Sequence, residues 1–136
     1  MKSYQLTLKV LSLGILGIAL IHITLGISSE TLLGSGVSTR SLADPNLDSQ
    51  NRFYGATFAL FTVVFWLGST DLVKYRLLLI GGFAVFFVGG LARIVSMIVV
   101  GQPSEAVILL TAIEIVGPPG MYLWLNHVLD QGTDDA

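Results

Sequence analysis

The sequence contains no cysteine, and only 12% of its 136 residues are charged. Without cysteine the chain can form neither disulfides nor thiolate metal sites, and it has no cysteine nucleophile. A soluble globular domain carries about 25% charged residues, roughly twice that share. Seven basic side chains stand against nine acidic ones, and no basic patch is available to hold the phosphates of a nucleic acid. These shortages exclude a nucleic-acid-binding protein and argue against a water-soluble enzyme.

What the chain has instead is hydrophobic residues, which make up 53% of it. They gather in four segments, and apart from residues at the segment ends the only charged side chains within them are Arg93 and Glu114. Each segment supplies the roughly 20 helical residues needed to cross a hydrocarbon core of about 30 Å. We therefore predict an all-α integral membrane protein, a four-helix bundle with antiparallel neighbours. The expected spans are residues 8–28, 52–70, 76–100 and 105–128, joined by a polar outer loop at 29–50 within a single domain over 1–136.

Cap and turn residues mark where these spans begin. Asp48 or Ser49 is expected to cap the second helix, and Pro103 or Ser104 to begin the fourth. The acidic residues of the outer loop, Glu30 among them, are expected to be solvated. The first segment is expected to stay in the protein, because its apolar run exceeds the roughly 7–15 residues of a cleaved signal peptide and no Ala-x-Ala site follows it.

Lysine and arginine near the span ends predict the orientation. Four of them lie on the side of the two termini and two on the other side: Lys2, Lys9, Lys74 and Arg76 against Arg40 and Arg52. Since basic residues are retained on the cytoplasmic side, we expect a multi-pass membrane protein with both termini in the cytoplasm.

Arg93 and Glu114 form the leading candidate site. A charge at the centre of a membrane helix costs about 2.5–3.5 kcal/mol on insertion scales, so it normally faces a partner inside the bundle. At about 1.5 Å per residue, Arg93 lies roughly 10 Å and Glu114 roughly 15 Å below the outer ends of adjacent antiparallel helices. We therefore predict an ion pair. It either fixes helix register without chemistry or presents Arg93 to a carboxylate or phosphate, and the sequence leaves both open.

Every predicted helix contributes a polar group to the same outer half. The expected ligand-binding or polar cluster is Arg93, Glu114, His22, Arg52, Asn51, Tyr54, Ser96 and Thr111. For His22 an interhelical hydrogen bond is favoured over a metal or proton role. His22 and Glu114 alone fall short of the three or four ligands that a metal usually takes, so neither a metal nor a cofactor is expected. Arg52 and Tyr54 are also typical of residues at the headgroup boundary.

Pro118 and Pro119 are expected to break the fourth helix directly after Glu114. Because proline has no N–H group, the carbonyl groups of Glu114 and Ile115, four residues earlier, lose their helical donors. Inside lipid such carbonyl groups need another partner or a cavity. The sequence thus places a carboxylate, a helix break and unpaired acceptors at one depth.

Three short motifs carry a resemblance to a known family: Asn51–Arg52, Gly89–Gly90–Leu91–Ala92–Arg93, and Glu114 with Pro118–Pro119. With them the sequence resembles the bacterial family catalogued as domain of unknown function 4345, small proteins with four membrane helices. The resemblance covers most of the chain apart from the first loop and the tail. It implies a four-helix membrane bundle and brings no established activity with it.

The leading functional hypothesis is an inner-membrane protein that binds an amphipathic or anionic molecule, or a lipid, in an outward-facing pocket. In it Arg93 holds the anionic end, Glu114 orients Arg93 or exchanges a proton, and His22 and Arg52 line the mouth. The alternative is an accessory or structural subunit of a larger membrane complex, or a homo-oligomer. An enzyme that uses Glu114 or His22 as acid or base ranks last, because no nucleophile or cofactor motif accompanies them.

Overall fold

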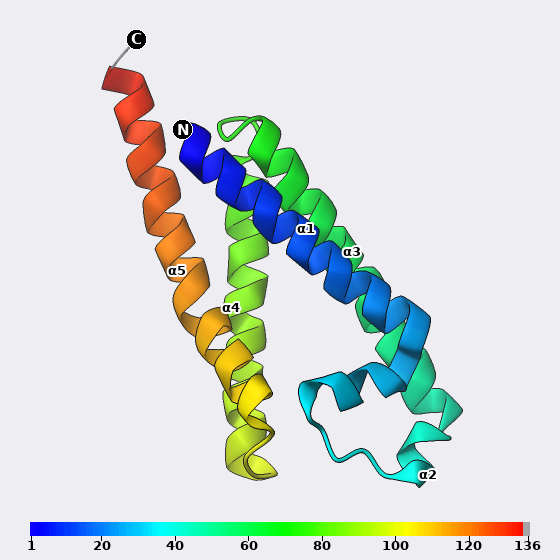
Figure 1. The fold of residues 1–136 in the computed structure, drawn as a ribbon. Helices are drawn as coiled ribbons and strands as arrows, with labels where there is room; N and C mark the ends of the chain where they lie inside the picture. The colour runs from blue at the N-terminus through cyan, green and yellow to red at the C-terminus, as the bar shows by residue number, and fades with distance from the viewer. Residues whose placement is uncertain (135–136) are drawn as a thin grey trace.

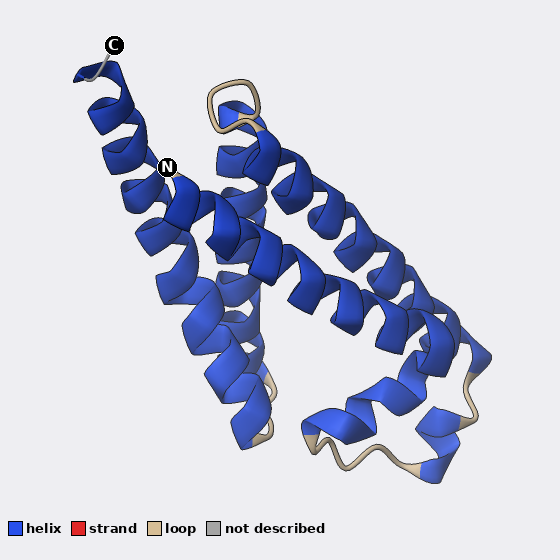
Figure 2. Cartoon of the chain, turned by 45° about the horizontal axis from the view of Figure 1, so that its top comes forward, coloured by secondary structure: helices blue, strands red, loops and turns tan. Residues whose placement is uncertain are grey.

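Four long helices and two short ones make up the fold, and no strand occurs in residues 1–134, the part of the chain that the computed structural model describes (Figure 2). In chain order they are α1 (Lys2–Leu25), the 3-10 helix η1 (Gly26–Leu33), α2 (Thr39–Leu42), α3 (Pro45–Thr70), α4 (Arg76–Val99) and α5 (Glu105–Asp134). The four long helices are long and apolar enough to cross a membrane. The predicted four-helix membrane bundle is confirmed.

The bundle consists of two helix pairs that meet at one end. α1 packs along α3, and α4 packs along α5 (Figure 1). The pairs converge at the end that carries both termini and diverge towards the opposite end, which we call the distal end (Figure 1). η1 runs from the distal end of α1 towards α4 and α5 (Figure 1). There the Ser104 hydroxyl donates to the carbonyl oxygen of Leu33 at 2.6 Å, which joins η1 to the start of α5.

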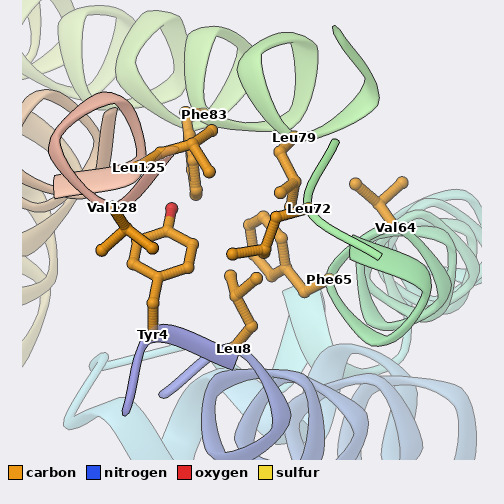
Figure 3. Packing of buried hydrophobic residues seen from close by; sticks show 9 residues of the cluster. All are labelled: Tyr4, Leu8, Val64, Phe65, Leu72, Leu79, Phe83, Leu125 and Val128. Carbon is orange, nitrogen blue, oxygen red and sulfur yellow. The ribbon is translucent and has the colours of Figure 1, made fainter. Parts of the chain in front are cut away.

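The buried hydrophobic core lies where the two pairs converge. It draws on all four long helices and the α3–α4 turn: Tyr4, Leu8, Val64, Phe65, Leu72, Leu79, Phe83, Leu125 and Val128 (Figure 3). Tyr4 also donates its hydroxyl to the carbonyl oxygen of Met121 at 3.0 Å, which ties α1 to α5. Many apolar side chains outside this core are exposed, for instance Leu77 at 83% and Ile98 at 78%. Such surface suits helices whose outer faces contact lipid.

Two glycines set the close approach within the pairs. A Cβ atom on Gly55 of α3 would lie 2.8 Å from the backbone nitrogen of Ile23 and 2.9 Å from the carbonyl oxygen of Ala19. A Cβ atom on Gly90 of α4 would lie 3.0 Å from the Cβ atom of Glu114. Small residues let membrane helices pack closely. Gly90 therefore lets α5 bring Glu114 against α4.

The second long helix begins earlier than the sequence predicted. It starts at Pro45, ahead of the predicted cap at Asp48 or Ser49, and its cap is Asp44, whose carboxylate accepts from the N–H of Asn46 at 2.8 Å. The predicted cap at Asp48 or Ser49 is therefore wrong. A proline at the first helical position needs no N–H partner and has a suitable φ angle, so Asp44–Pro45 starts the helix within the polar stretch. Much of the expected outer loop is consequently helical.

The predicted break in the last helix is also corrected. α5 continues as one α-helix through Pro118 and Pro119. Each proline removes one N–H donor and leaves the carbonyl group four residues earlier without its helical partner. A membrane helix tolerates this loss where surrounding groups or a lined cavity accommodate the freed carbonyl. The prolines thus alter the hydrogen bonding of α5 without ending it.

Candidate functional site

A cavity of about 520 Å³ lies between the two helix pairs. Its volume falls within the roughly 300–1,000 Å³ of pockets that hold small molecules. Its walls are largely apolar, with aliphatic side chains from α1 and α5 and four phenylalanines from α3 and α4: Phe58, Phe65, Phe83 and Phe86. η1 contributes Ser29, Leu32 and Leu33 to the lining. Ionisable groups enter the lining from three helices, as His22, Arg93 and Glu114.

The predicted ion pair is present in this cavity. Nε of Arg93 donates to Oε2 of Glu114 at 2.8 Å. The side chain of Glu114 is 14% exposed, while that of Arg93 is 36% exposed. Glu114 therefore engages one edge of the guanidinium group. The terminal nitrogens Nη1 and Nη2 have no hydrogen-bond partner among residues 1–134, so their N–H groups are available to another molecule.

Arg93 also borders a second, smaller cavity of about 300 Å³ at the distal end. Ser96 and Gln102 line it together with the turn that joins α4 to α5. The side chain of Arg93 thus borders both the large apolar cavity and a smaller, more polar one. Ser96, expected in the ligand-binding cluster, belongs to this smaller cavity.

His22 belongs to a buried hydrogen-bond network that joins α1, η1 and α3. Nδ1 of His22 lies 2.6 Å from Oδ1 of Asn51 and 3.0 Å from the hydroxyl of Ser29. Ser29 donates to the same Asn51 oxygen at 2.9 Å. The amide nitrogen of Asn51 donates to Glu30 at 2.8 Å. His22, Ser29 and Asn51 are 8%, 2% and 3% exposed, and the imidazole ring stacks on Phe58.

Arg52 does not belong to the lining of the large cavity, where the sequence placed it at the mouth. Its Nε donates to Oδ2 of Asp48 at 2.7 Å. Its Nη1 donates to the carbonyl oxygens of Ile23 and Thr24. A cation at the carboxyl end of a helix satisfies its last carbonyl groups and opposes the helix dipole. Arg52 therefore caps α1 rather than facing a ligand.

Three further predicted residues occupy different places. Asn51 lies behind His22 as its hydrogen-bond partner rather than in the cavity wall. Thr111 is buried and donates to the carbonyl oxygen of Val107 in its own helix. Tyr54 is 51% exposed and, like Thr111, is not part of either cavity lining. The structure thus brings His22, Arg93 and Glu114 to one cavity and leaves these three outside its wall.

Ser29 and Glu30 are site residues that the sequence analysis missed, having assigned Glu30 to a solvated loop. Both lie in η1, which continues directly from α1. α1 ends at Leu25, and Gly26 has a φ of 57°, so the chain changes direction before Ser29. No helical spacing in the sequence therefore signals the contact between Ser29 and His22.

Two ionisable residues in the large cavity carry groups that bind metals, His22 and Glu114. Over residues 1–131, whose side chains the structure describes, no group of three or more His, Cys, Asp or Glu side chains is arranged to hold a metal ion.

Comparison with known proteins gives one match. The sequence model of the family described as Domain of unknown function (DUF4345) matches residues 3–125. The match includes the ion pair, the His22 network and both prolines. No curated protein and no solved structure matches the chain.

Proposed function

The chain belongs to the DUF4345 family, and we propose that it binds an amphipathic or anionic molecule, such as a lipid, in the cavity between its two helix pairs. The observation that carries this proposal is a guanidinium group with unpaired terminal N–H groups in the wall of a largely apolar cavity. An arginine so placed can form strong charge-assisted hydrogen bonds to a carboxylate or phosphate.

Glu114 orients Arg93 for this role. By accepting from Nε, it fixes one edge of the guanidinium plane. The two terminal nitrogens lie on the remaining edges, where they match the fork-like geometry of two anionic oxygens. A carboxylate that occupied both terminal nitrogens would close the site. The ion pair therefore both compensates the charge of Arg93 and leaves it able to bind.

The aromatic side chains suit the hydrocarbon part of such a ligand. Phe58, Phe65, Phe83 and Phe86 extend the cavity towards the core at the terminal end. Burial of apolar surface stabilises a bound chain by about 25 cal/mol per Å². The ligand then has its anionic end at Arg93 and its tail along these rings.

We further propose the inner bacterial membrane as the location, with both termini in the cytoplasm. Both termini lie at the same end of the bundle (Figure 1), and the lysine and arginine residues concentrate near that end, as the positive-inside rule requires of a cytoplasmic face. In this orientation η1 and the smaller cavity face outward.

Native mass spectrometry of the detergent-purified protein tests the proposal. We expect the parent chain to carry bound anionic lipid and the Arg93→Ala variant to lose it. Arg40→Ala is the matched control. Arg40 is exposed in α2 and lines neither cavity, so this substitution removes the same charge outside the proposed site. Equal lipid content in a folded Arg93→Ala variant overturns the proposal.

A double variant covers the case in which Arg93→Ala fails to fold. Arg93→Leu combined with Glu114→Leu removes both charges, so neither is left without its partner. We expect the double variant to fold and to lose bound lipid. A lipid content equal to that of the parent overturns the proposal. Co-purification in the same mild detergent tests the subunit alternative, which predicts a stable protein partner at every concentration.

A further inference from the structure

The hydrogen-bond network behind His22 determines which of its ring nitrogens carries the proton. Nδ2 of Asn51 donates to the Glu30 carboxylate, and an ionised carboxylate only accepts. The Asn51 oxygen must therefore face His22. Because that oxygen also only accepts, Nδ1 of His22, at 2.6 Å, must carry hydrogen. In the neutral ring Nε2 is then a hydrogen-bond acceptor.

Nε2 of His22 is the ring nitrogen that the network leaves unpaired. It has no hydrogen-bond partner among residues 1–131, whose side chains the structure describes. Within the same residues, no fully buried side-chain nitrogen or oxygen lacks a partner, so Nε2 must reach accessible space although the residue is only 8% exposed. The space that His22 lines is the large cavity. The network therefore leaves an unpaired ring nitrogen on a residue of the cavity wall.

The cavity thus offers opposite hydrogen-bonding groups on different helices. Arg93 on α4 offers donors only, while the neutral form of the His22 ring on α1 would offer an acceptor. A ligand head that carries only an anionic group satisfies Arg93 and leaves Nε2 unpaired. A head with a hydroxyl group beside its anionic group satisfies both.

The cavity volume limits the hydrocarbon part. If a methylene group takes up about the volume of a water molecule in the liquid, roughly 30 Å³, a cavity of about 520 Å³ holds one chain of roughly 16 carbon atoms. A second chain of the same length would have to lie outside this volume.

From these observations, which rest on the proposed function, we infer that the ligand is a single-chain amphiphile whose head joins an anionic group to a hydroxyl group. Arg93 binds the anionic oxygens, and Nε2 of His22 accepts from the hydroxyl. His22 is thereby a specificity-determining residue, held in one tautomer by Asn51 and Glu30. A lysophospholipid with a glycerol headgroup has this chemistry.

Two single-chain phosphodiesters, one with hydroxyl groups on its small ester group and one without, test the inference. Hexadecylphosphoglycerol and methyl hexadecyl phosphate share one chain and one negative charge, and only the first has hydroxyls. We expect the parent to bind hexadecylphosphoglycerol several-fold to roughly tenfold more tightly, the range of one hydrogen bond. His22→Phe keeps a ring to stack on Phe58 and should bind both probes equally. His127→Phe, a change at an exposed histidine at the other end, should retain the preference.

The possible failures are distinguishable. If the parent binds both probes equally and Arg93→Ala binds neither, this inference is overturned. The proposed function then still stands. If neither probe binds the parent, or if Arg93→Ala binds the probes as tightly as the parent does, both proposals fail. Dipalmitoylphosphatidylglycerol adds the second chain to the same headgroup. If the parent binds dipalmitoylphosphatidylglycerol as tightly as hexadecylphosphoglycerol, the size limit is overturned.

Nitrogen NMR provides a readout that does not depend on how His22→Phe folds. In the His127→Phe protein His22 is the remaining histidine, so its two ¹⁵N signals are unambiguous. We expect a protonated Nδ1 and an unprotonated Nε2, with the Nε2 signal shifting on addition of hexadecylphosphoglycerol and not of the methyl ester. A protonated Nε2 beside a bare Nδ1 overturns the inference.

Discussion

Glu114 engages only one of the three guanidinium nitrogens of Arg93, through a hydrogen bond of 2.8 Å between Oε2 and Nε. Glu114 balances the charge of Arg93, but it accepts a hydrogen bond from Nε alone and none from the two terminal nitrogens. The same contact would serve an ion pair that only fixes the register of α4 against α5 and the binding role that we propose. The predictions below separate the contribution of this pair to stability from its use in binding.

Glu114→Ala should destabilise the protein by about 1–3 kcal/mol, because it leaves a half-buried guanidinium without its acceptor. Glu114→Gln keeps an acceptor for Nε and should lose less. The free energy of unfolding, measured by titration with sodium dodecyl sulfate in mixed micelles, checks both values. Equal stability of parent and Glu114→Ala would show that the contact contributes nothing to the bundle.

Gly55→Ala should destabilise the bundle by about 1–3 kcal/mol, the usual cost of overpacking. The new methyl group would lie within 3 Å of the α1 backbone at Ala19 and Ile23, which cannot move aside as a side chain can. Gly17→Ala is the matched control, since a Cβ atom there meets no described atom within 4 Å. The control should be neutral or slightly stabilised, because alanine favours helix more than glycine does. Thermal unfolding in detergent separates the two outcomes.

Asp44→Ala should lower stability by about 1 kcal/mol through loss of the cap on α3. Ser49→Ala, at a position that the sequence favoured as the cap, should have almost no effect, because Ser49 is exposed within the helix. Circular dichroism during denaturant titration compares them. A larger loss in Ser49→Ala than in Asp44→Ala would contradict the observed helix start.

Asn51→Leu should cost about 1–3 kcal/mol, because it leaves His22 and Ser29 without their shared acceptor inside the protein. Ser29→Ala alone should cost less, since Nδ1 of His22 keeps Asn51. The double variant should be less destabilised than the sum of the two single variants, as expected for residues in one network. Strict additivity in the unfolding free energies would argue against a connected network.

The sequence identified most of what depends on local chemistry. Hydropathy alone placed four membrane helices, because backbone groups in lipid must be satisfied within each span. It also predicted the contact between Arg93 and Glu114, because a short link makes α4 and α5 antiparallel neighbours and the rise per residue puts their depths within about 5 Å of each other. The start of α3 was missed because a helix can continue through polar residues such as 45–51, which a hydropathy window excludes.

Tertiary structure decided the use of each polar group and the existence of the cavity. Arg52 caps α1 only because α1 ends beside it, and Glu30 reaches Asn51 only because η1 packs against α3. The cavity arises because the two helix pairs converge at the terminal core and diverge beyond it (Figure 1). That divergence depends on packing between residues far apart in the chain, such as Tyr4 and Met121. No single segment encodes it, since helix crossing angles follow from how two surfaces fit together.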